Sequence, residues 1–454
     1  MNSLQRPKQL ELNWDAPTTL GSKSYRSEEF IASYLSESPT GQVRLMESIL
    51  ERSNMNRAIE RVIKNKGAPG VDGMTVRKVK RYVRRHRTKI EEALLNGTYV
   101  PMPVRRKEIP KPGGVRLLGI PTVLDRVIQQ AVAQIMTLIW DHSFSRYSYG
   151  FRPERSQHEA IRQYREYVRA GYRYVVDLDI SKFFDRVNHD RLMSRLATRI
   201  KDKRVLKLIR SFLTSGVMIG GLEQPTTEGT PQGGPASPIL SNIVLDELDK
   251  ELEKRGLRFV RYADDCIIFV KSERAGDRVM KSVSRFIEEK MGLKINREKS
   301  AVGRPWNRKY LGFCVTNSHK EPKIRIHWKT IKRFKERVRE ITARSRGRSI
   351  AQVIAELNQY LQGWWNYYGL TESYNRLTPL AHWIRRRLRA VIWTHWKNRR
   401  TRVRELLKRG ISRTFALTTG CARKGPWRMS NVKWVNIALP DSYFKSLRLV
   451  FPWA

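Results

Sequence analysis

The spacing of apolar and polar residues divides the chain into an interleaved α and β part and a mostly helical part. Up to about residue 325, short apolar runs with strand-like alternation are interspersed with longer stretches of helical periodicity. Glycine and proline clusters separate these elements, as expected for turns and loops. Beyond that point the period is helical almost throughout. The pattern predicts an α+β domain followed by an α-helical domain.

One predicted hairpin carries two adjacent acids at its tip. Residues 258–271 form two apolar, strand-like runs that meet at Asp264 and Asp265. Side chains of a regular strand alternate between its faces, so adjacent carboxylates can act together only where the chain turns. Such a pair repels itself unless a cation lies between the two charges. A divalent metal is the usual cation, and two-metal sites are how polymerases join nucleotides.

A third carboxylate is expected from the strand predicted at residues 172–180. Its alternation places Val175, Asp177 and Asp179 on one face. Asp179 is the better candidate because it ends the strand, and Asp177 is its nearest competitor. An isolated acid at a strand end usually caps a helix or faces solvent. Here three carboxylates would supply the oxygen ligands that Mg²⁺ prefers, and the chain offers no competing His/Cys cluster.

The composition adds a polyanionic partner to this picture. The 454-residue chain has a formal net charge of +46, 40% hydrophobic residues and 12 Trp, which indicates a folded, strongly basic protein. We expect nucleic-acid binding that weakens steeply with salt. No long apolar stretch or basic amphipathic anchor accompanies the charge, so we expect no membrane partner. The first residues lack an apolar signal core, which favours an intracellular protein.

The charge is unevenly distributed along the chain. Residues 301–454 contain 34 Lys and Arg against 7 Asp and Glu, together with 10 of the 12 Trp. A more balanced, acid-containing part thus precedes a basic, aromatic part. The simplest interpretation is chemistry in the first part and nucleic-acid binding in the second.

A helix predicted at residues 377–407 carries a basic face. Its apolar residues recur at helical spacing, which predicts a stripe that packs in the core. Between them lie Arg385, Arg386, Arg387 and Arg389. Such a face is often merely solvated, but with the local charge this high we expect it to contact nucleic acid.

Two loop regions supply groups suited to a nucleoside triphosphate. Lys111 and Arg116 flank a Gly-Gly turn, and a hairpin with a basic residue on each arm can fold over phosphates. Gln232 lies in a turn rich in Pro and Gly and offers an amide donor. Phe184 could form the floor of a sugar pocket and reject a 2′-hydroxyl, whereas the alternative for it, as for Phe183, is a core position. Each of these signals is weak alone.

Taken in order, these segments resemble the seven-block reverse transcriptase fold, specifically that of the group II intron reverse transcriptase/maturase family. The matching stretches are Gly67-Ala-Pro-Gly-Val-Asp-Gly73, Ile109-Pro-Lys-Pro-Gly-Gly-Val-Arg-Leu-Leu-Gly-Ile-Pro121, Tyr149-Gly-Phe-Arg-Pro153, Val176-Asp-Leu-Asp-Ile-Ser-Lys-Phe-Phe-Asp185, Gly229-Thr-Pro-Gln-Gly-Gly-Pro-Ala-Ser-Pro238, Arg261-Tyr-Ala-Asp-Asp265, Leu293-Lys-Ile-Asn-Arg-Glu-Lys-Ser300 and Tyr310-Leu-Gly-Phe313. Eight blocks in the same order make coincidence negligible.

The resemblance implies an α+β right-hand polymerase with fingers and an antiparallel palm sheet, followed by a helical thumb and a small basic segment. The corresponding ranges are 1–44 for an amino-terminal extension, 45–325 for fingers and palm, 326–405 for the thumb or maturase domain, and 406–454 for a DNA-binding segment. No His/Cys-rich endonuclease module follows that segment in this sequence. We therefore expect insertion at a replication fork or hairpin target rather than second-strand cleavage.

The resemblance also assigns roles to individual residues. It implies that Asp179, Asp264 and Asp265 bind two Mg²⁺ ions with the help of the Ile180 backbone, that Lys111 and Arg116 contact the triphosphate of the dNTP substrate, and that Gln232 and Phe184 shape the nucleotide pocket.

The activity implied is that of an RNA-directed DNA polymerase and intron maturase. Its partners would be group II intron RNA, an RNA template/DNA primer duplex and target DNA. It would act in the bacterial cytoplasm, associated with the nucleoid when acting on DNA. Two alternatives remain open. One is a host-recruited relative in DNA repair or phage defence, which a flanking ribozyme would exclude. The other is a splicing-only RNA-binding protein, which the intact acids argue against.

Overall fold

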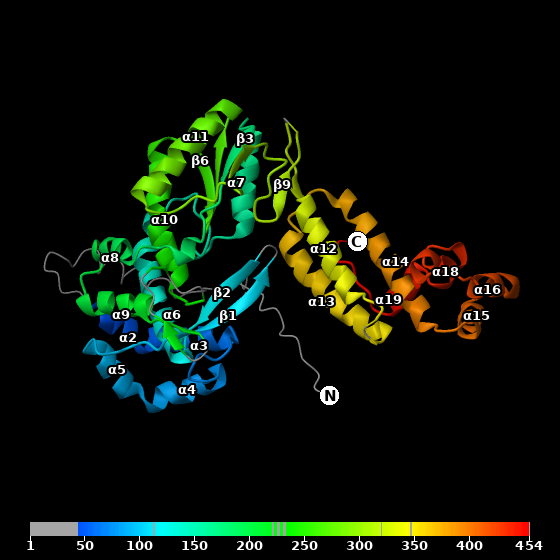
Figure 1. Ribbon diagram of the computed structural model, residues 1–454, viewed down its shortest axis with the longest axis horizontal. Coiled ribbons are helices and arrows are strands. Elements are labelled where there is room, and N and C mark those ends of the chain that lie inside the picture. Colours follow the sequence, from blue (N-terminus) through cyan, green and yellow to red (C-terminus); the bar gives the residue numbers. More distant parts are fainter. Residues whose placement is uncertain are drawn as a thin grey trace. The chain divides into compact units, whose positions relative to one another are not determined.

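The chain forms two compact units (Figure 1). The computed structural model describes residues 44–111, 114–219, 222–224, 228–229, 233–318, 320–345 and 347–453. The first unit comprises the chain up to Tyr164 and Tyr172–Gly303, and the second comprises Arg165–Gly171 and the chain from Arg304 onward. The domain ranges given above, with their boundaries near 44, 325 and 405, stay predictions.

The first unit mixes helices with two sheets. Its helices are α2 (Leu45–Leu50), α3 (Arg52–Lys64), α4 (Val76–Arg85), α5 (Arg87–Leu95), α6 (Val123–Trp140), α7 (Gln157–Arg169), α8 (His189–Ala197), α9 (Lys203–Thr214), α10 (Ser237–Lys254) and α11 (Glu273–Arg285), with short helical turns at Asp141–Ser143, Phe183–Asp185 and Phe286–Lys290. Its strands are β1 (Val104–Lys111), β2 (Gly114–Ile120), β3 (Tyr174–Leu178), β4 (Val217–Ile219), β5 (Leu222–Gln224), β6 (Arg258–Tyr262), β7 (Asp265–Val270) and β8 (Ala301–Gly303).

The strands assemble into two four-stranded sheets. One has the order β2-β1-β4-β5, in which β1 and β2 form the antiparallel hairpin predicted around residues 111–116. The other has the order β6-β7-β3-β8 and is antiparallel at every pairing. The predicted α+β part with an antiparallel sheet is therefore confirmed.

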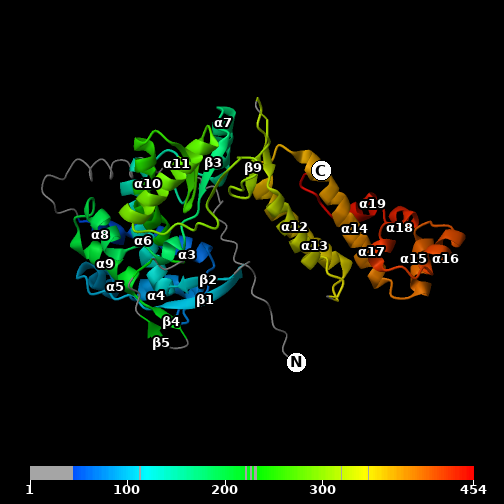
Figure 2. The same cartoon turned by 45° about the horizontal axis from the view of Figure 1, so that its top comes forward.

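Helices cover both faces of the β6-β7-β3-β8 sheet (Figures 1 and 2). On one face, α11 packs against β3, β7 and β8, and α10 packs against β6. The paired residues Val176 and Ile268 are buried in the core on this side. Phe269 points the opposite way, because neighbouring strand residues alternate. It meets Tyr164 of α7 edge to face, with ring centroids 5.0 Å apart.

The second unit is mostly helical, as predicted. After the two-stranded sheet of β9 (Phe313–Val315) and β10 (Ile324–Ile326) come α12 (Trp328–Ile341), α13 (Ile350–Tyr368), a helical turn at Tyr374–Arg376, α14 (Thr378–His395), α15 (Arg399–Lys408), α16 (Arg413–Gly420), α17 (Pro426–Met429), α18 (Lys433–Ala438) and α19 (Asp441–Ser446). In the described residues of both units, no helix has the length and apolarity needed to cross a membrane.

Many aromatic residues of the second unit are core residues. Phe334 of α12 and Trp364 of α13 lie with ring centroids 4.5 Å apart. Trp453, near the end of the chain, packs against Trp364 at 5.8 Å. Trp393 and Trp396 are buried as well. The high Trp content of this region therefore reflects packing as well as any contact with nucleic acid.

The helix predicted at residues 377–407 is in fact two helices. The chain leaves helical geometry after α14, and Asn398 caps α15 by accepting a hydrogen bond from the backbone N–H of Thr401 at 2.8 Å. Asparagine competes with the backbone for hydrogen bonds and so favours such caps. The apolar stripe of α14 is buried as predicted, from Leu380 to Val391.

The arginines of α14 do not form a single open face, and their contact with nucleic acid stays a prediction. Arg385 and Arg389 are only 13% and 12% exposed, and both pair with Asp441, at 3.1 and 3.5 Å. Arg389 also donates to the carbonyl of Leu439 at 2.9 Å, and Arg385 lies over the ring of Phe451. These two guanidiniums hold the carboxyl-terminal segment on α14, a role that helical periodicity alone does not reveal.

We expect Asp441→Asn to destabilise the second unit. The change removes the carboxylate shared by two poorly exposed guanidiniums, and it should lower the free energy of unfolding by about 1–2 kcal/mol. Urea unfolding followed by Trp fluorescence measures this, because most Trp residues lie in this unit. Glu321→Gln, an exposed acid of the same unit, is the control. Equal midpoints for the two variants would contradict the assigned role.

Candidate active site

The strand register brings Asp179 to the hairpin that carries the other two acids. Leu178, the last residue of β3, pairs with Cys266 of β7. Because the strands are antiparallel, the residue after Leu178 lies opposite the residue before Cys266. These two residues are Asp179 and Asp265, which are therefore neighbours. Asp264 lies in the turn between β6 and β7. Three acids from two distant parts of the sequence thus lie at one end of the sheet.

The segment after α11 holds Asp179 in place. The backbone N–H of Asp179 donates to the Ser300 hydroxyl at 2.9 Å, and its carbonyl accepts from the backbone of Asn296 at 2.8 Å. The carboxylate lies 3.4 Å from the ammonium of Lys299 and remains about one third exposed. All three partners belong to the block 293–300, which therefore positions this acid.

The oxygen donors at this end of the sheet suit a hard cation such as Mg²⁺. The ammonium of Lys299 already lies beside one of the carboxylates, where positive charge is required. Within the described residues, however, no three His, Cys, Asp or Glu side chains converge closely enough to form a metal site. The neighbouring Ile180 is buried, and its backbone bridges to Ile295. The metal-ligand roles of Ile180 and of the three acids remain predictions.

The turn between β6 and β7 is backed by the motif at residues 149–153. Ala263 adopts a left-handed backbone conformation with φ of +55°, which is uncommon for a residue other than Gly. Gly150 approaches so closely that a Cβ atom on it would lie 2.3 Å from the backbone nitrogen of Ala263. Any larger residue at position 150 would push the turn out of place, so glycine is required there.

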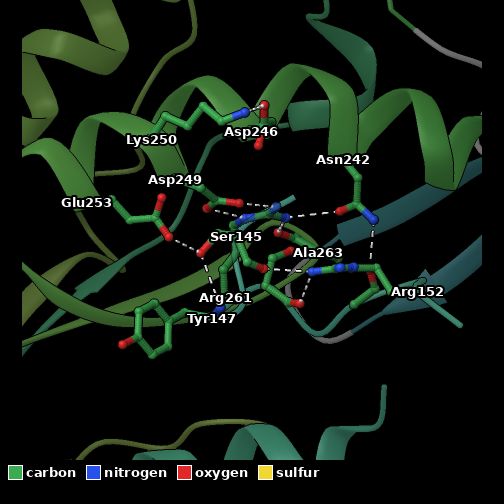
Figure 3. Close-up of polar contacts among 12 residues, drawn as sticks. Ser145, Tyr147, Arg152, Asn242, Asp246, Asp249, Lys250, Glu253, Arg261 and Ala263 are labelled. Atoms are coloured by element: carbon green, nitrogen blue, oxygen red, sulfur yellow. Dashed lines mark hydrogen bonds and ion pairs between the residues drawn. The ribbon is translucent and has the colours of Figure 1, made fainter. Parts of the chain in front are cut away.

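Arg261 fixes the same turn from inside the core (Figure 3). Its guanidinium is fully buried and forms two hydrogen bonds with Asp249 of α10, at 2.7 and 2.5 Å. It also donates to the side chain of Asn242 at 3.1 Å and to the carbonyl of Ala263 at 3.0 Å. Burial alone would lower the pKa of Arg261, but the adjacent Asp249 carboxylate raises it, so the guanidinium stays charged.

Hydrogen bonds continue from Arg261 into the 149–153 motif. Asn242 donates to the carbonyl of Gly150 at 2.8 Å, and the backbone of Arg261 exchanges hydrogen bonds with Tyr147 and Tyr149. Arg152 of the motif pairs with Asp141 at 2.7 Å. It also donates to the carbonyl of Ser145 at 2.6 Å (Figure 3) and to that of Ser148 at 3.0 Å. Sequence reasoning missed this network. Its one visible signal is an arginine on the core-facing side of an apolar strand.

One segment proposed for the nucleotide pocket lies close to Phe184. Phe183 is a core residue at 2% exposed, whereas Phe184 is half-buried. Gly229, which opens the block that contains Gln232, is so close that a Cβ atom would lie 2.9 Å from the Phe184 carbonyl. Gly233 similarly approaches the carbonyl of Gly119 on β2. Gln232 and the side chains of Lys111 and Arg116 lie outside the described residues, so their roles stay predictions.

We expect Asp249→Asn to destabilise the first unit strongly. It leaves the buried Arg261 charge without its counter-ion, which typically costs about 3–5 kcal/mol. Combining Arg261→Met with Asp249→Leu removes both charges and should restore most of that loss. Chemical denaturation of the three proteins measures it. If the single and double variants unfolded at the same denaturant concentration, the ion pair would not be what supports the turn.

Known protein families match both units. Residues 107–315 match the family described as "Reverse transcriptase (RNA-dependent DNA polymerase)". Residues 331–410 match the family described as "Group II intron, maturase-specific domain". The first match contains Asp179 and the β6–β7 turn, and it agrees with the expected right-hand polymerase fold.

Individual relatives extend the similarity. "Protein YkfC" of Escherichia coli (strain K12) is 32% identical over 314 residues, covering 60% of this chain and 82% of the relative. "Group II intron-encoded protein LtrA" of Lactococcus lactis subsp. cremoris is 29% identical over 429 residues, covering 72% of this chain and 70% of the relative. "Putative COX1/OXI3 intron 2 protein" of Saccharomyces cerevisiae is 33% identical over 259 residues, covering 44% of this chain and 30% of the relative. The chain therefore belongs to the group II intron-encoded reverse transcriptase/maturase family.

Proposed function

We propose that Asp179, Asp264 and Asp265 are the catalytic, metal-binding carboxylates of this RNA-directed DNA polymerase. The observation that supports this most directly is the β3–β7 register, which makes Asp179 the neighbour of Asp265 although 85 residues separate them along the chain. Acids concentrated in this way repel one another, so a function that supplies cations explains the arrangement better than a structural one.

The chain's own residues would orient the reacting groups. The β6–β7 turn, held by Arg261 and Gly150, would fix two carboxylates, and the 293–300 segment would fix the third. Bound Mg²⁺ ions would lower the pKa of the primer 3′-hydroxyl and neutralise the departing pyrophosphate. Lys299 would provide countercharge to Asp179 when no metal is bound. Catalysis would then rest on positioning and electrostatic stabilisation.

The remaining site residues would handle the incoming nucleotide. Lys111 ends β1 and Arg116 lies on β2, so both belong to one hairpin, whose basic side chains would bind the triphosphate of the dNTP. Phe184 would contact the sugar and Gln232 would complete the pocket. The proximity of Gly229 to Phe184 supports placing these two segments in one pocket.

The maturase-specific domain indicates binding to intron RNA. We propose that this binding assists splicing of the group II intron that encodes the chain. After splicing, the polymerase site would copy the intron from a DNA primer at the target DNA. RNA shape and backbone contacts, rather than reading of base edges, would dominate the recognition of the folded RNA.

Asp264→Asn should abolish primer extension on an RNA template while leaving RNA affinity almost unchanged. The change keeps the size of the side chain and removes only its charge, so the fold should persist. Radiolabelled primer extension and filter binding measure the two properties. Asp190→Asn, an exposed acid on α8, is the matched control and should extend primers normally. Simultaneous loss of extension and RNA binding in the Asp264 variant would point to a folding defect and refute the catalytic assignment.

Splicing of the cognate intron RNA at low Mg²⁺ concentration should require the protein. A basic protein that binds the folded ribozyme replaces part of the countercharge that Mg²⁺ otherwise supplies. The splicing rate should therefore rise by at least about tenfold when the protein is added at low Mg²⁺, a difference of about 1.4 kcal/mol. The Asp264→Asn protein should assist equally well. Identical rates with and without protein would remove the maturase function.

A further inference from the structure

A small cavity in the second unit is lined by basic and aromatic side chains. It measures about 150 Å³ and lies between α14, α17 and the loop that follows α12. Its lining residues are Thr342, Arg344, Arg387, Ala390 and Trp427. Since a water molecule occupies about 30 Å³ in the liquid, the cavity has room for a small hydrated group.

Further cations lie over two indole rings of the same helices, one of which, Trp427, lines the cavity. Lys335 and Arg339 of α12 and Arg387 of α14 all lie within 6 Å of the ring of Trp383, at 5.9, 5.6 and 5.5 Å. Arg386 covers the ring of Trp427 at 4.0 Å. With Arg344 on the rim, five positive side chains from two helices and a loop gather around two indole rings.

These five cations have no acidic partner in the described part of the chain. The ion pairs of the second unit involve other arginines, such as Arg385 and Arg389 with Asp441. Arg387 instead donates to the hydroxyl of Thr342 at 2.6 Å. Burial, and then the nearby charges of Arg339 and Arg344, lower the pKa of Arg387. The cluster therefore repels itself, in contrast to the neutralised arginines elsewhere on α14.

One donor of the cluster is also unsatisfied. The Nε atom of Arg386 is buried and forms no hydrogen bond within the described structure. A buried donor without a partner costs roughly 1–3 kcal/mol. This donor adds to the cost of the cluster, and the repulsion between the guanidiniums at the cavity is relieved by an anion with several oxygens.

We propose that this cavity binds a backbone phosphate of a nucleic-acid strand, with Arg344 and Arg387 as its ligands and the Trp427 ring as a surface for the adjoining base. The proposal rests on the proposed RNA-binding function and deepens it. The planar guanidinium of arginine can donate two parallel hydrogen bonds to the oxygens of one phosphate. Trp427 is 39% exposed, and exposed indoles beside basic grooves stack bases of single strands. Cations spread over two helices suit a chain of phosphates better than one free ion.

Arg344→Glu tests the site in the full-length protein. Arg344 is exposed and lies in a loop, so the change should not affect folding. Affinity for a fluorescein-labelled single-stranded RNA oligonucleotide should fall about tenfold, and the slope of log affinity against log salt should drop by about 1. Arg344→Lys should keep most of the affinity. Arg400→Glu, an equal charge change on exposed α15, should weaken binding only about twofold because salt screens distant charges.

A double-mutant cycle shows whether the groups form one site. Because Arg344 and Trp427 line the same cavity, the effects of Arg344→Glu and Trp427→Ala on RNA affinity should be non-additive. Each substitution should weaken RNA binding only slightly in a protein that already carries the other substitution. Arg400→Glu combined with Trp427→Ala should be additive. Additivity in both cycles, or an unchanged salt slope in Arg344→Glu, would overturn the proposal.

The nucleic-acid source and the underlying function are tested separately. Single-stranded RNA, single-stranded DNA and duplex DNA of one sequence are compared. If Arg344→Glu lowered the affinity for one of the single strands tenfold and left that for the duplex unchanged, the result would support a single-strand phosphate site. It would also show whether the strand is RNA or DNA. If Arg344→Glu weakened the affinity for all three nucleic acids equally, the cavity would contribute only general positive charge, and the proposal would be overturned. If the unmodified protein bound no RNA, the proposed function would fail. If the unmodified protein bound RNA and the Arg344→Glu variant bound it equally well, only the proposed role of the cavity would fail.

Discussion

The buried ion pair between Arg261 and Asp249 is the constraint on which the candidate active site depends. Both side chains are completely buried, so water cannot stabilise either charge. Such a pair is tolerated only when its remaining hydrogen-bonding groups are also satisfied. The fold meets this condition by directing one nitrogen of Arg261 at Asn242 and at the carbonyl of Ala263. The backbone carbonyl of the turn therefore satisfies part of the hydrogen-bonding capacity of a charge buried in the core.

This arrangement explains how the fold tolerates acids that repel each other. Asp264 and Asp265 follow a residue in left-handed conformation, next to a third acid on the neighbouring strand. A left-handed backbone is unfavourable for alanine, so contacts from elsewhere in the fold help to stabilise the turn. These contacts come from α10 through Arg261 and from Gly150. Segments far apart in sequence therefore act together on one turn.

The sequence predicted those parts of the site that depend on local periodicity. Strand alternation and an acidic hairpin tip pointed to Asp264, Asp265 and either Asp179 or Asp177, and the family resemblance favoured Asp179, which the strand register makes a neighbour of Asp265. The supporting network was not predictable, because Asp249 looks like any acid on a helix. Whether it faces water or a buried arginine is decided by the packing of α10 on β6. The same limit explains why periodicity did not reveal the ion pairs of Arg385 and Arg389, where α19 supplies the carboxylate of Asp441 to a helix face that the sequence suggested was open.

The two units present opposite electrostatic problems. At the end of the β6-β7-β3-β8 sheet, the carboxylates of Asp179, Asp264 and Asp265 concentrate negative charge, and the ammonium of Lys299 lies 3.4 Å from that of Asp179. Around Trp383 and Trp427, positive charge is concentrated with no carboxylate from the described chain to balance it. Both concentrations of like charge oppose folding, in contrast to the charges paired at Arg261 and at Asp441. Their persistence is explained if each is completed by a ligand of opposite charge, a cation at the acids and a phosphate at the basic cavity. Charge imbalance, and not packing, therefore distinguishes these two places from the rest of the described chain.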